Sequence, residues 1–237
     1  MTVHPEPYEP LLTSVVLYRL PGCCLLLDVR VNLLAGLVCA GACFAQHYEI
    51  GGAIGYGVYH NGSIISSGGT ADAGIRNRFA AGAVFGEDFY EHLSGEVRYL
   101  YHDGDPFLSA GSAKGNVQGQ SHALHYDVLF HLKPRGERIR PFAAGGVGGK
   151  CYETTGPAPV PQPLPKIAAL ATQSEWKPLF TFGGGVKIRI SDHVMVRGDV
   201  RDYITTFPKA LFTPVSGATE RGIFHQFTPL FGLGYTF

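Results

Sequence analysis

The alternation of apolar with small or polar side chains constrains this chain more than any other feature of its sequence. From Tyr48 to Phe237 there are about eight stretches of roughly ten residues in which every second side chain is apolar. In the first stretch Ile50, Ile54 and Tyr56 share one face, while glycines and one glutamate occupy the other. A repeat of two residues is the repeat of a β-strand. The pattern therefore predicts an all-β fold whose strands each have one apolar face.

The connections between these stretches alternate in length. The short ones cover residues 86–92, 134–138 and 191–193. The long ones are rich in Gly, Ser, Pro or Thr and cover residues 60–73, 103–119, 154–175 and 205–222. Short turns at one end and long loops at the other are typical of an up-and-down antiparallel barrel that spans a membrane. An even number of strands places both ends of the barrel segment on the side of the short turns.

The non-apolar faces carry glycines together with charges of both signs. A soluble barrel or a β-sandwich would turn these faces to water and bury the apolar ones. So many glycines beside so many charges do not suit a soluble outer surface, whereas a narrow interior lets the charges pair while lipid covers the apolar faces. We therefore predict a closed transmembrane β-barrel with an interior polar network formed by Arg76, Arg78, Glu96, Arg98, Asp127, Lys187, Arg189, Arg197, Asp199 and Arg201.

The N-terminal segment has the layout of a secretory signal peptide. Residues 33–45 are apolar and uncharged, follow Arg30, and end in small residues around Phe44. The run falls short of the about 20 apolar residues of a membrane helix, so we expect cleavage after Ala45. The prediction is an N-terminal extension plus signal peptide over residues 1–45 and a barrel over residues 46–237. Because the leader before Arg30 is atypical, we expect translation to start near Val29 or Val31.

Charge and cysteine content narrow the range of partners. The 19 Lys and Arg balance the 19 Asp and Glu, so no field draws the chain to nucleic acid. Four of the five cysteines precede Ala45, which leaves Cys151 alone in the mature chain and excludes an internal disulfide there. His125, Asp127 and His131 have a spacing that could hold a metal on one strand face, but we expect interior hydrogen bonds instead. We predict no cofactor and no metal.

The last strand carries the most specific signal. A terminal Phe237 is preceded at every second position by Tyr235, Leu233 and Phe231. This ending resembles the C-terminal signature of outer-membrane β-barrels, and the resemblance implies that the barrel-assembly machinery reads these residues. Residues 46–237 as a whole resemble the small OmpA/OmpX-type barrels, within the outer membrane β-barrel domain and porin families of Gram-negative bacteria. The resemblance implies a monomer in the outer membrane that contacts outer-membrane lipid and lipopolysaccharide, with a structural or surface-interaction role.

Small barrels of this type also include lipid A deacylases, lipid A palmitoyltransferases and surface proteases. A hydrolase needs a nucleophile within reach of a base, and the best candidates flank one predicted outer loop: His102, Asp103, Asp105, Ser109, Ser112, Ser121 and His122. The His-x-Ser-Asn arrangement of the deacylases is absent, so we expect solvated loop residues and no catalytic site. A lipid A-modifying hydrolase is the alternative. A narrow passive pore is the second alternative function, although the interior of an eight-stranded barrel is narrow enough for side chains to fill.

Three further patterns lead to expectations about placement. Arg197-Gly198-Asp199 spells an integrin-binding tripeptide, but both charged side chains are predicted to lie inside the barrel. The proline-rich segment 156–165 predicts an extended, exposed arm. Trp176, Tyr152 and Tyr203 are expected to anchor the aromatic girdle where strands leave the bilayer.

Overall fold

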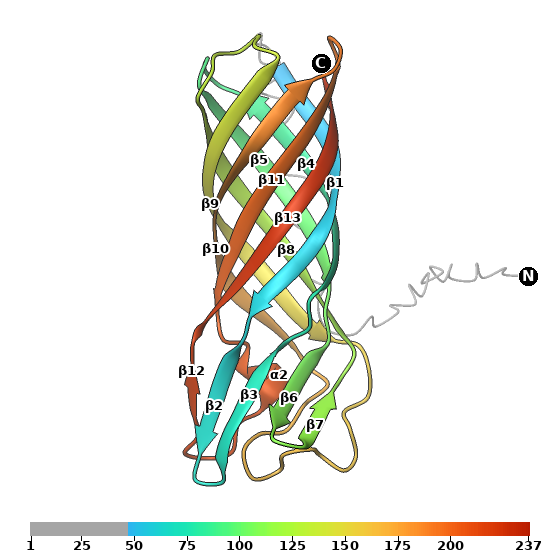
Figure 1. Cartoon of the computed structure of the whole chain (residues 1–237), viewed down its shortest axis with the longest axis vertical. Helices are drawn as coiled ribbons and strands as arrows, with labels where there is room; N and C mark the ends of the chain where they lie inside the picture. Colours follow the sequence, from blue (N-terminus) through green and yellow to red (C-terminus); the bar gives the residue numbers. More distant parts are fainter. Residues whose placement is uncertain (1–46) are drawn as a thin grey trace, which may run out of the picture.

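The computed structural model describes residues 47–237, apart from the side chain of Arg221. The predicted leader, the signal peptide and the cleavage at Ala45 lie outside the described residues. Figure 1 shows a long barrel with a smaller sheet continuing from one end, and the C-terminus at the opposite end. Within residues 47–237 no helix is long and apolar enough to cross a membrane.

Eight antiparallel strands close the barrel, as the alternation predicts. Each strand pairs with the next barrel strand along the chain, and the first pairs with the last. The strands are β1 (His47–His60), β4 (Arg78–Asp88), β5 (Leu93–Asp103), β8 (Gly119–His131), β9 (Ile139–Thr154), β10 (Ser174–Arg189), β11 (Val194–Thr206) and β13 (Ile223–Thr236). The up-and-down barrel predicted from the sequence is thus confirmed.

The apolar faces of the strands point outward. Phe182 is 68% exposed, Phe231 60% and Ile54 58%. In β5, Val97 is 42% exposed, whereas its charged neighbours Glu96 and Arg98 are buried. Glycines on the inner face let neighbouring backbones approach closely. At Gly55, for example, a Cβ would lie 2.1 Å from the carbonyl oxygen of Pro229 in β13. The outer wall is therefore a continuous apolar band around a narrow interior.

The long connections fold into a cap over one end of the barrel, which the sequence analysis did not predict. Five short strands form a second sheet in the order β12-β2-β3-β6-β7. They are β2 (Gly62–Ser66), β3 (Gly69–Ile75), β6 (Pro106–Ala110), β7 (Ala113–Asn116) and β12 (Thr219–Arg221). The cap also contains the one-turn helix α2 (Lys209–Phe212), which precedes β12 in the chain. Ile64, Leu108 and Phe212 are fully buried in the core of this cap. The prediction of open, solvated loops is wrong because these segments bury an apolar core of their own.

The proline-rich segment packs onto the cap over part of its length. Val160 is 94% exposed, but Leu164 packs against the cap core. The Gln162 side chain exchanges two hydrogen bonds with the backbone of Leu170, at 2.9 and 3.0 Å. The predicted exposure of this segment is confirmed at Val160 and wrong at Gln162 and Leu164, because polar and apolar contacts hold these two residues against the cap.

Candidate functional site: the barrel interior

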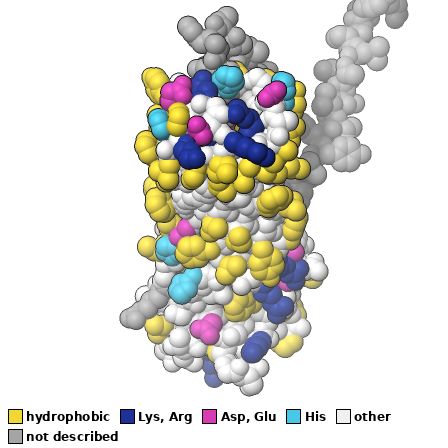
Figure 2. Space-filling model, turned by 45° about the horizontal axis from the view of Figure 1, so that its top comes forward, with side chains coloured by type: hydrophobic (Ala, Val, Ile, Leu, Met, Phe, Trp, Pro, Cys, Tyr) yellow, Lys and Arg dark blue, Asp and Glu magenta, His cyan; other side chains and the backbone are white. Residues whose placement is uncertain are grey.

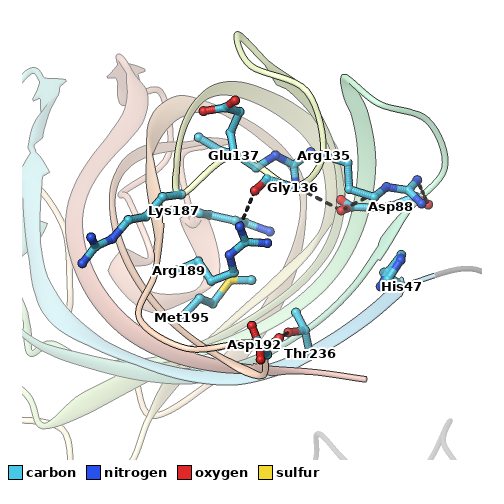
Figure 3. A pocket seen from close by; sticks show the side chains of 12 residues that line it. His47, Asp88, Arg135, Gly136, Glu137, Lys187, Arg189, Asp192, Met195 and Thr236 are labelled. Carbon is cyan, nitrogen blue, oxygen red and sulfur yellow. Dashed lines mark hydrogen bonds and ion pairs between the residues drawn. The ribbon is translucent and has the colours of Figure 1, made fainter.

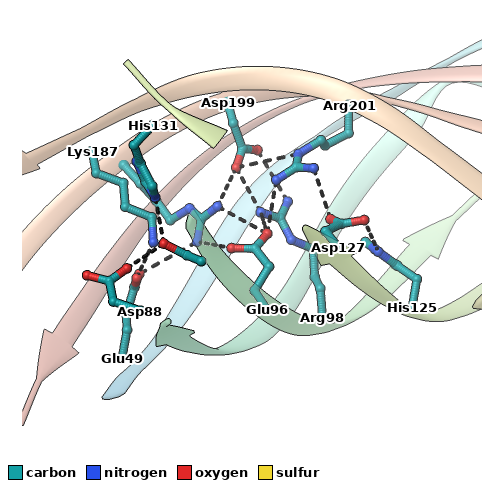
Figure 4. Close-up of polar contacts among 12 residues, drawn as sticks. Glu49, Asp88, Glu96, Arg98, His125, Asp127, His131, Lys187, Asp199 and Arg201 are labelled. Atoms are coloured by element: carbon teal, nitrogen blue, oxygen red, sulfur yellow. Dashed lines mark hydrogen bonds and ion pairs between the residues drawn. The ribbon is translucent and has the colours of Figure 1, made fainter. Parts of the chain in front are cut away.

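Three arginines share two carboxylates at the centre of the barrel (Figure 4). Arg98 lies 2.8 Å from both Glu96 and Asp199, and Arg197 lies 3.0 Å from Glu96 and 2.8 Å from Asp199. Arg201 lies 3.0 Å from Glu96. All five side chains are at most 2% exposed. Buried charges are tolerated when each has close opposite partners, and here several charges of each sign supply them.

The network continues through β8 and β10. Arg201 also donates to Asp127 at 2.9 Å, and Asp127 accepts from His125 at 3.0 Å. The hydroxyl of Thr181 donates to the same carboxylate. Strands from both sides of the barrel are thereby cross-linked through its middle, and the interior at this level is filled by side chains.

A second ionic layer lies nearer the short turns. Lys187 pairs with Glu49, and Arg140 lies 3.0 Å from Asp88. The hydroxyl of Ser94 lies 2.8 Å from Nε2 of His131. Glu49, Asp88 and Arg140 are interior residues that the sequence analysis did not include. Strand parity could have identified Glu49, which lies on the glycine face of β1. It could not identify Arg140, because Arg140 shares a face with the apolar Phe142 in the glycine-rich β9 and both are buried.

Three of the ten residues predicted for the interior network do not join it. Arg78, with its side chain 41% exposed, pairs with Asp103 and Asp105 at the junction with the cap. Arg76 and Arg189 are exposed. The first two belong to the chain between β3 and the start of β4, and Arg189 is the last residue of β10. The strands reach the ends of the barrel there, so the prediction is corrected for these three residues.

Between the central network and the cap, the cation Lys150 lies among aromatic rings. Its Nζ lies 4.8 Å from the ring centroid of Tyr152, 5.3 Å from that of Tyr59 and 5.9 Å from that of Tyr203. It also donates to Gln226, and no ion pair joins it to a carboxylate of the described residues. Cation–π contacts of this kind stabilise a desolvated ammonium group. This layer joins the barrel interior to the apolar core of the cap, because Tyr59 and Tyr152 also belong to that core.

Two of the three predicted girdle residues lie inside the barrel instead. Tyr152 and Tyr203 are 1% and 0% exposed, whereas Trp176 is 57% exposed on the outer face. Tyr203 follows Arg201 by two residues and therefore shares its inward face. The girdle prediction is wrong for these tyrosines, because the alternation of the strands turns Tyr203 inward with Arg201 and Tyr152 inward with Lys150.

The candidate catalytic residues do not converge. His102 is buried, with Nε2 3.5 Å from the hydroxyl of Thr228. On the opposite face of the wall, His122 contacts the hydroxyl of Tyr99 at 2.7 Å. Asp103 and Asp105 are held by Arg78.

The three serines of the same group lie in different settings. Ser109 is in β6 of the cap, Ser112 lies in the turn between β6 and β7, and Ser121 is buried in β8. Ser121 lies opposite His102 in the β5–β8 ladder, but no side-chain hydrogen bond among the described residues joins one of these serines to His102 or His122. The arrangement therefore assembles no nucleophile and base pair from these candidates.

The other candidate residues have the following surroundings. Among residues 47–237, no group of three or more His, Cys, Asp and Glu side chains could hold a metal ion. Arg197 and Asp199 of the tripeptide are buried and bonded to each other at 2.8 Å. Phe237, Tyr235, Leu233 and Phe231 all point outward, at 49% to 60% exposure. Their reading by the assembly machinery stays a prediction.

Comparisons with known proteins identify relatives by fold alone. No known sequence family and no curated protein matches the chain. Among solved structures, the outer membrane protein OprG from Pseudomonas aeruginosa matches with a TM-score of 0.53 and 15% identity, over 81% of this chain and 96% of OprG. Neisserial surface protein A matches with a TM-score of 0.47 and 12% identity, over 82% of this chain and 100% of that one. The match to OprG shows that the chain has the fold of a small outer-membrane β-barrel.

Proposed function

We propose that this chain is an integral protein of the bacterial outer membrane, where it spans the lipid as a closed barrel and presents its cap outside the cell. The observation that carries the proposal is the pairing of an apolar outer wall with an ionic interior. Exposed Phe182 and Phe231 would be costly in water, and lipid is the solvent that accepts such a wall. The fold shared with OprG supports the same location.

The proposed role is structural or surface-interacting, without catalysis and without a conducting pore. Buried ion pairs fill the middle of the barrel, and the cap core covers one end. The cap is the part that would meet lipopolysaccharide, neighbouring cells or other surfaces. An eight-stranded barrel with a filled interior favours this role over the passive pore. The dispersed placement of His102 and His122 favours it over the lipid A hydrolase.

Expression in a Gram-negative host tests the location. We expect the chain to fractionate with the outer membrane and to migrate faster in SDS gels when unheated than after boiling, as closed barrels do. Deleting Phe237 should reduce the folded fraction if the assembly machinery reads the last strand. A chain that stays soluble without detergent, or shows no heat-dependent shift, would contradict the proposal.

Two readouts separate the alternative functions. Mass spectrometry of lipid A from the expressing host should show unchanged acyl chains. A loss or gain of acyl chains that disappears in His102→Ala or His122→Ala would instead establish the hydrolase or transferase. Planar bilayers containing the purified protein should show no steady conductance, and a stable single-channel current would favour the pore.

A further inference from the structure

Cationic side chains gather at the end of the barrel opposite the cap. Figure 2 turns this end forward and shows Lys and Arg side chains grouped on it. A cavity of about 310 Å³ opens there, between the β8–β9 turn and the β10–β11 turn (Figure 3). Five of its lining side chains are Arg or Lys and three are Asp or Glu. The cavity is separate from the central network, and none of the functions considered above uses it.

The register of β9 and β10 places like charges opposite each other twice in succession. Lys187 pairs with Arg140 across the ladder. One step further out, the backbone N–H of Arg189 donates to the carbonyl oxygen of Arg138 at 2.8 Å, which places these two arginines side by side. All four side chains line the cavity. Like charges directly opposite each other on one sheet face destabilise the pairing.

Only the inner of these two pairs is neutralised by carboxylates of the chain. Lys187 pairs with Glu49, and Arg140 lies 3.0 Å from Asp88. Among the ion pairs of the described residues, none includes Arg138 or Arg189. The only acceptor of the Arg189 guanidinium group among the described residues is the carbonyl oxygen of Gly136.

The remaining acidic residues of the cavity do not pair with Arg138 or Arg189. Glu137 and Asp192 also line it, yet neither forms an ion pair with the outer arginines. Two guanidinium groups therefore line one cavity at adjacent positions, and neither forms an ion pair with a described residue. Arg135, the remaining cation of the lining, already contacts Asp88, at 3.8 Å.

We propose that this cavity binds a phosphate-bearing anion held between Arg138 and Arg189. A guanidinium group presents paired N–H donors that match two oxygens of a phosphate group, and two such groups side by side suit a ligand with several anionic oxygens. Binding would relieve the like-charge contact across the ladder. The ligand is either a small free phosphate compound or a phospholipid headgroup. The periplasmic location of the site rests on the proposed function, whereas the binding chemistry does not.

Calorimetric titration of the full chain, refolded in dodecyl maltoside, with inorganic pyrophosphate tests the site. We expect saturable binding that weakens by about a hundredfold in the double variant Arg138→Gln/Arg189→Gln, since each of the two lost charge-assisted contacts contributes about tenfold, or about 1.4 kcal/mol. Lys133→Gln is the matched control, because Lys133 is exposed on the same turn but does not line the cavity. The control should bind as the wild type does.

A second measurement keeps the result independent of folding defects. Pyrophosphate should raise the temperature at which the fast-migrating band of the wild type disappears, and should leave that of the double variant unchanged. Equal binding by the wild type and the double variant, or no binding by a wild type that shows the heat-dependent shift, would overturn the inference. The latter result would leave the proposed membrane barrel standing.

Nanodiscs distinguish the two sources of phosphate. If a phospholipid headgroup fills the cavity, pyrophosphate should bind about tenfold more weakly in phosphatidylglycerol nanodiscs than in maltoside, and the double variant should show no such difference. Equal affinity in both environments, still lost in the double variant, would identify a small free phosphate compound as the ligand. Both outcomes support the site.

Discussion

The barrel interior and the cap are stabilised by opposite chemistry within one chain. The centre of the barrel is filled by ion pairs such as Arg98 with Asp199, both about 1% exposed. The cap is filled by apolar side chains such as Ile64 and Phe212, both 0% exposed. The barrel turns its apolar residues outward, so its interior must satisfy charges. The cap buries its apolar residues inward, as a soluble domain does. The difference indicates that the two regions have different solvents.

Removing one central carboxylate should lower the stability of the barrel more than any other change considered below. Glu96→Gln leaves Arg98, Arg197 and Arg201 with one acceptor charge fewer in a buried site. Loss of one partner from a buried ion pair typically costs about 3–5 kcal/mol. We expect the free energy of unfolding to fall by this amount. Urea unfolding of the barrel in phospholipid vesicles, monitored by the heat-dependent gel shift, measures it.

Glu87→Gln supplies the matched control for that experiment. Glu87 is a partly exposed residue near the end of β4 and forms no ion pair with the described residues. Its replacement should leave the urea midpoint nearly unchanged. If Glu96→Gln were equally silent, the network would not stabilise the barrel and the comparison would fail.

Removing one large apolar side chain should loosen the cap alone. Phe212→Ala deletes a fully buried ring that packs 5.1 Å, centroid to centroid, from Phe207. Phe→Ala in a core costs about 3–5 kcal/mol, and we expect about 3 kcal/mol because the cap is small enough to relax. Hydrogen exchange should speed up in β2, β3 and β6 and stay unchanged in the barrel strands.

Val160→Ala is the control in the cap, because Val160 is almost fully exposed. It should leave exchange in both regions as in the wild type. Faster exchange throughout the barrel in Phe212→Ala would show that the two regions unfold as one unit.

The smallest effect is expected at the junction of the two regions. Arg78 joins Asp103 and Asp105 at 3.1 and 2.7 Å. The side chain of Asp105 is 7% exposed, but that of Arg78 is 41% exposed, so water screens its charge. Exposed ion pairs contribute about 0–1 kcal/mol. Arg78→Gln should therefore change the urea midpoint and the exchange of the cap only slightly. A loss as large as that of Glu96→Gln would make the junction, and not the two cores, the main source of stability.

The barrel could be predicted from the sequence because long strands with alternating side chains give a strong periodic signal. The alternation predicts Ile50, Ile54 and Tyr56 on the apolar face, and all three are exposed. The same alternation placed Glu96, Asp127 and Arg201 inside. Tyr203 shares the inward parity of Arg201, so the alternation contradicts its placement in the girdle. The glycine-rich strand of Tyr152 gives no clear alternation, so its inward position could not be predicted in this way.

The cap could not be predicted in this way. Its strands are three to seven residues long and are separated by Gly, Ser and Pro, so no segment is long enough to show an alternation. Its core is assembled from residues far apart in the chain, such as Ile64, Leu108 and Phe212. The contact partners of the interior charges could not be predicted either. The strand alternation gives the face on which Arg98 lies but not its distance from Asp199.

Site-directed cysteine labelling on intact cells tests the central claim most directly. The described part of the chain has one cysteine, Cys151, which is 1% exposed and should not react. A membrane-impermeant maleimide should label Val160→Cys, in the cap, on intact cells. It should label Glu137→Cys, on the β8–β9 turn, only after the outer membrane is permeabilised. Labelling of Glu137→Cys on intact cells, or failure to label Val160→Cys until the cells are broken, would contradict a barrel that spans the outer membrane with its cap outside.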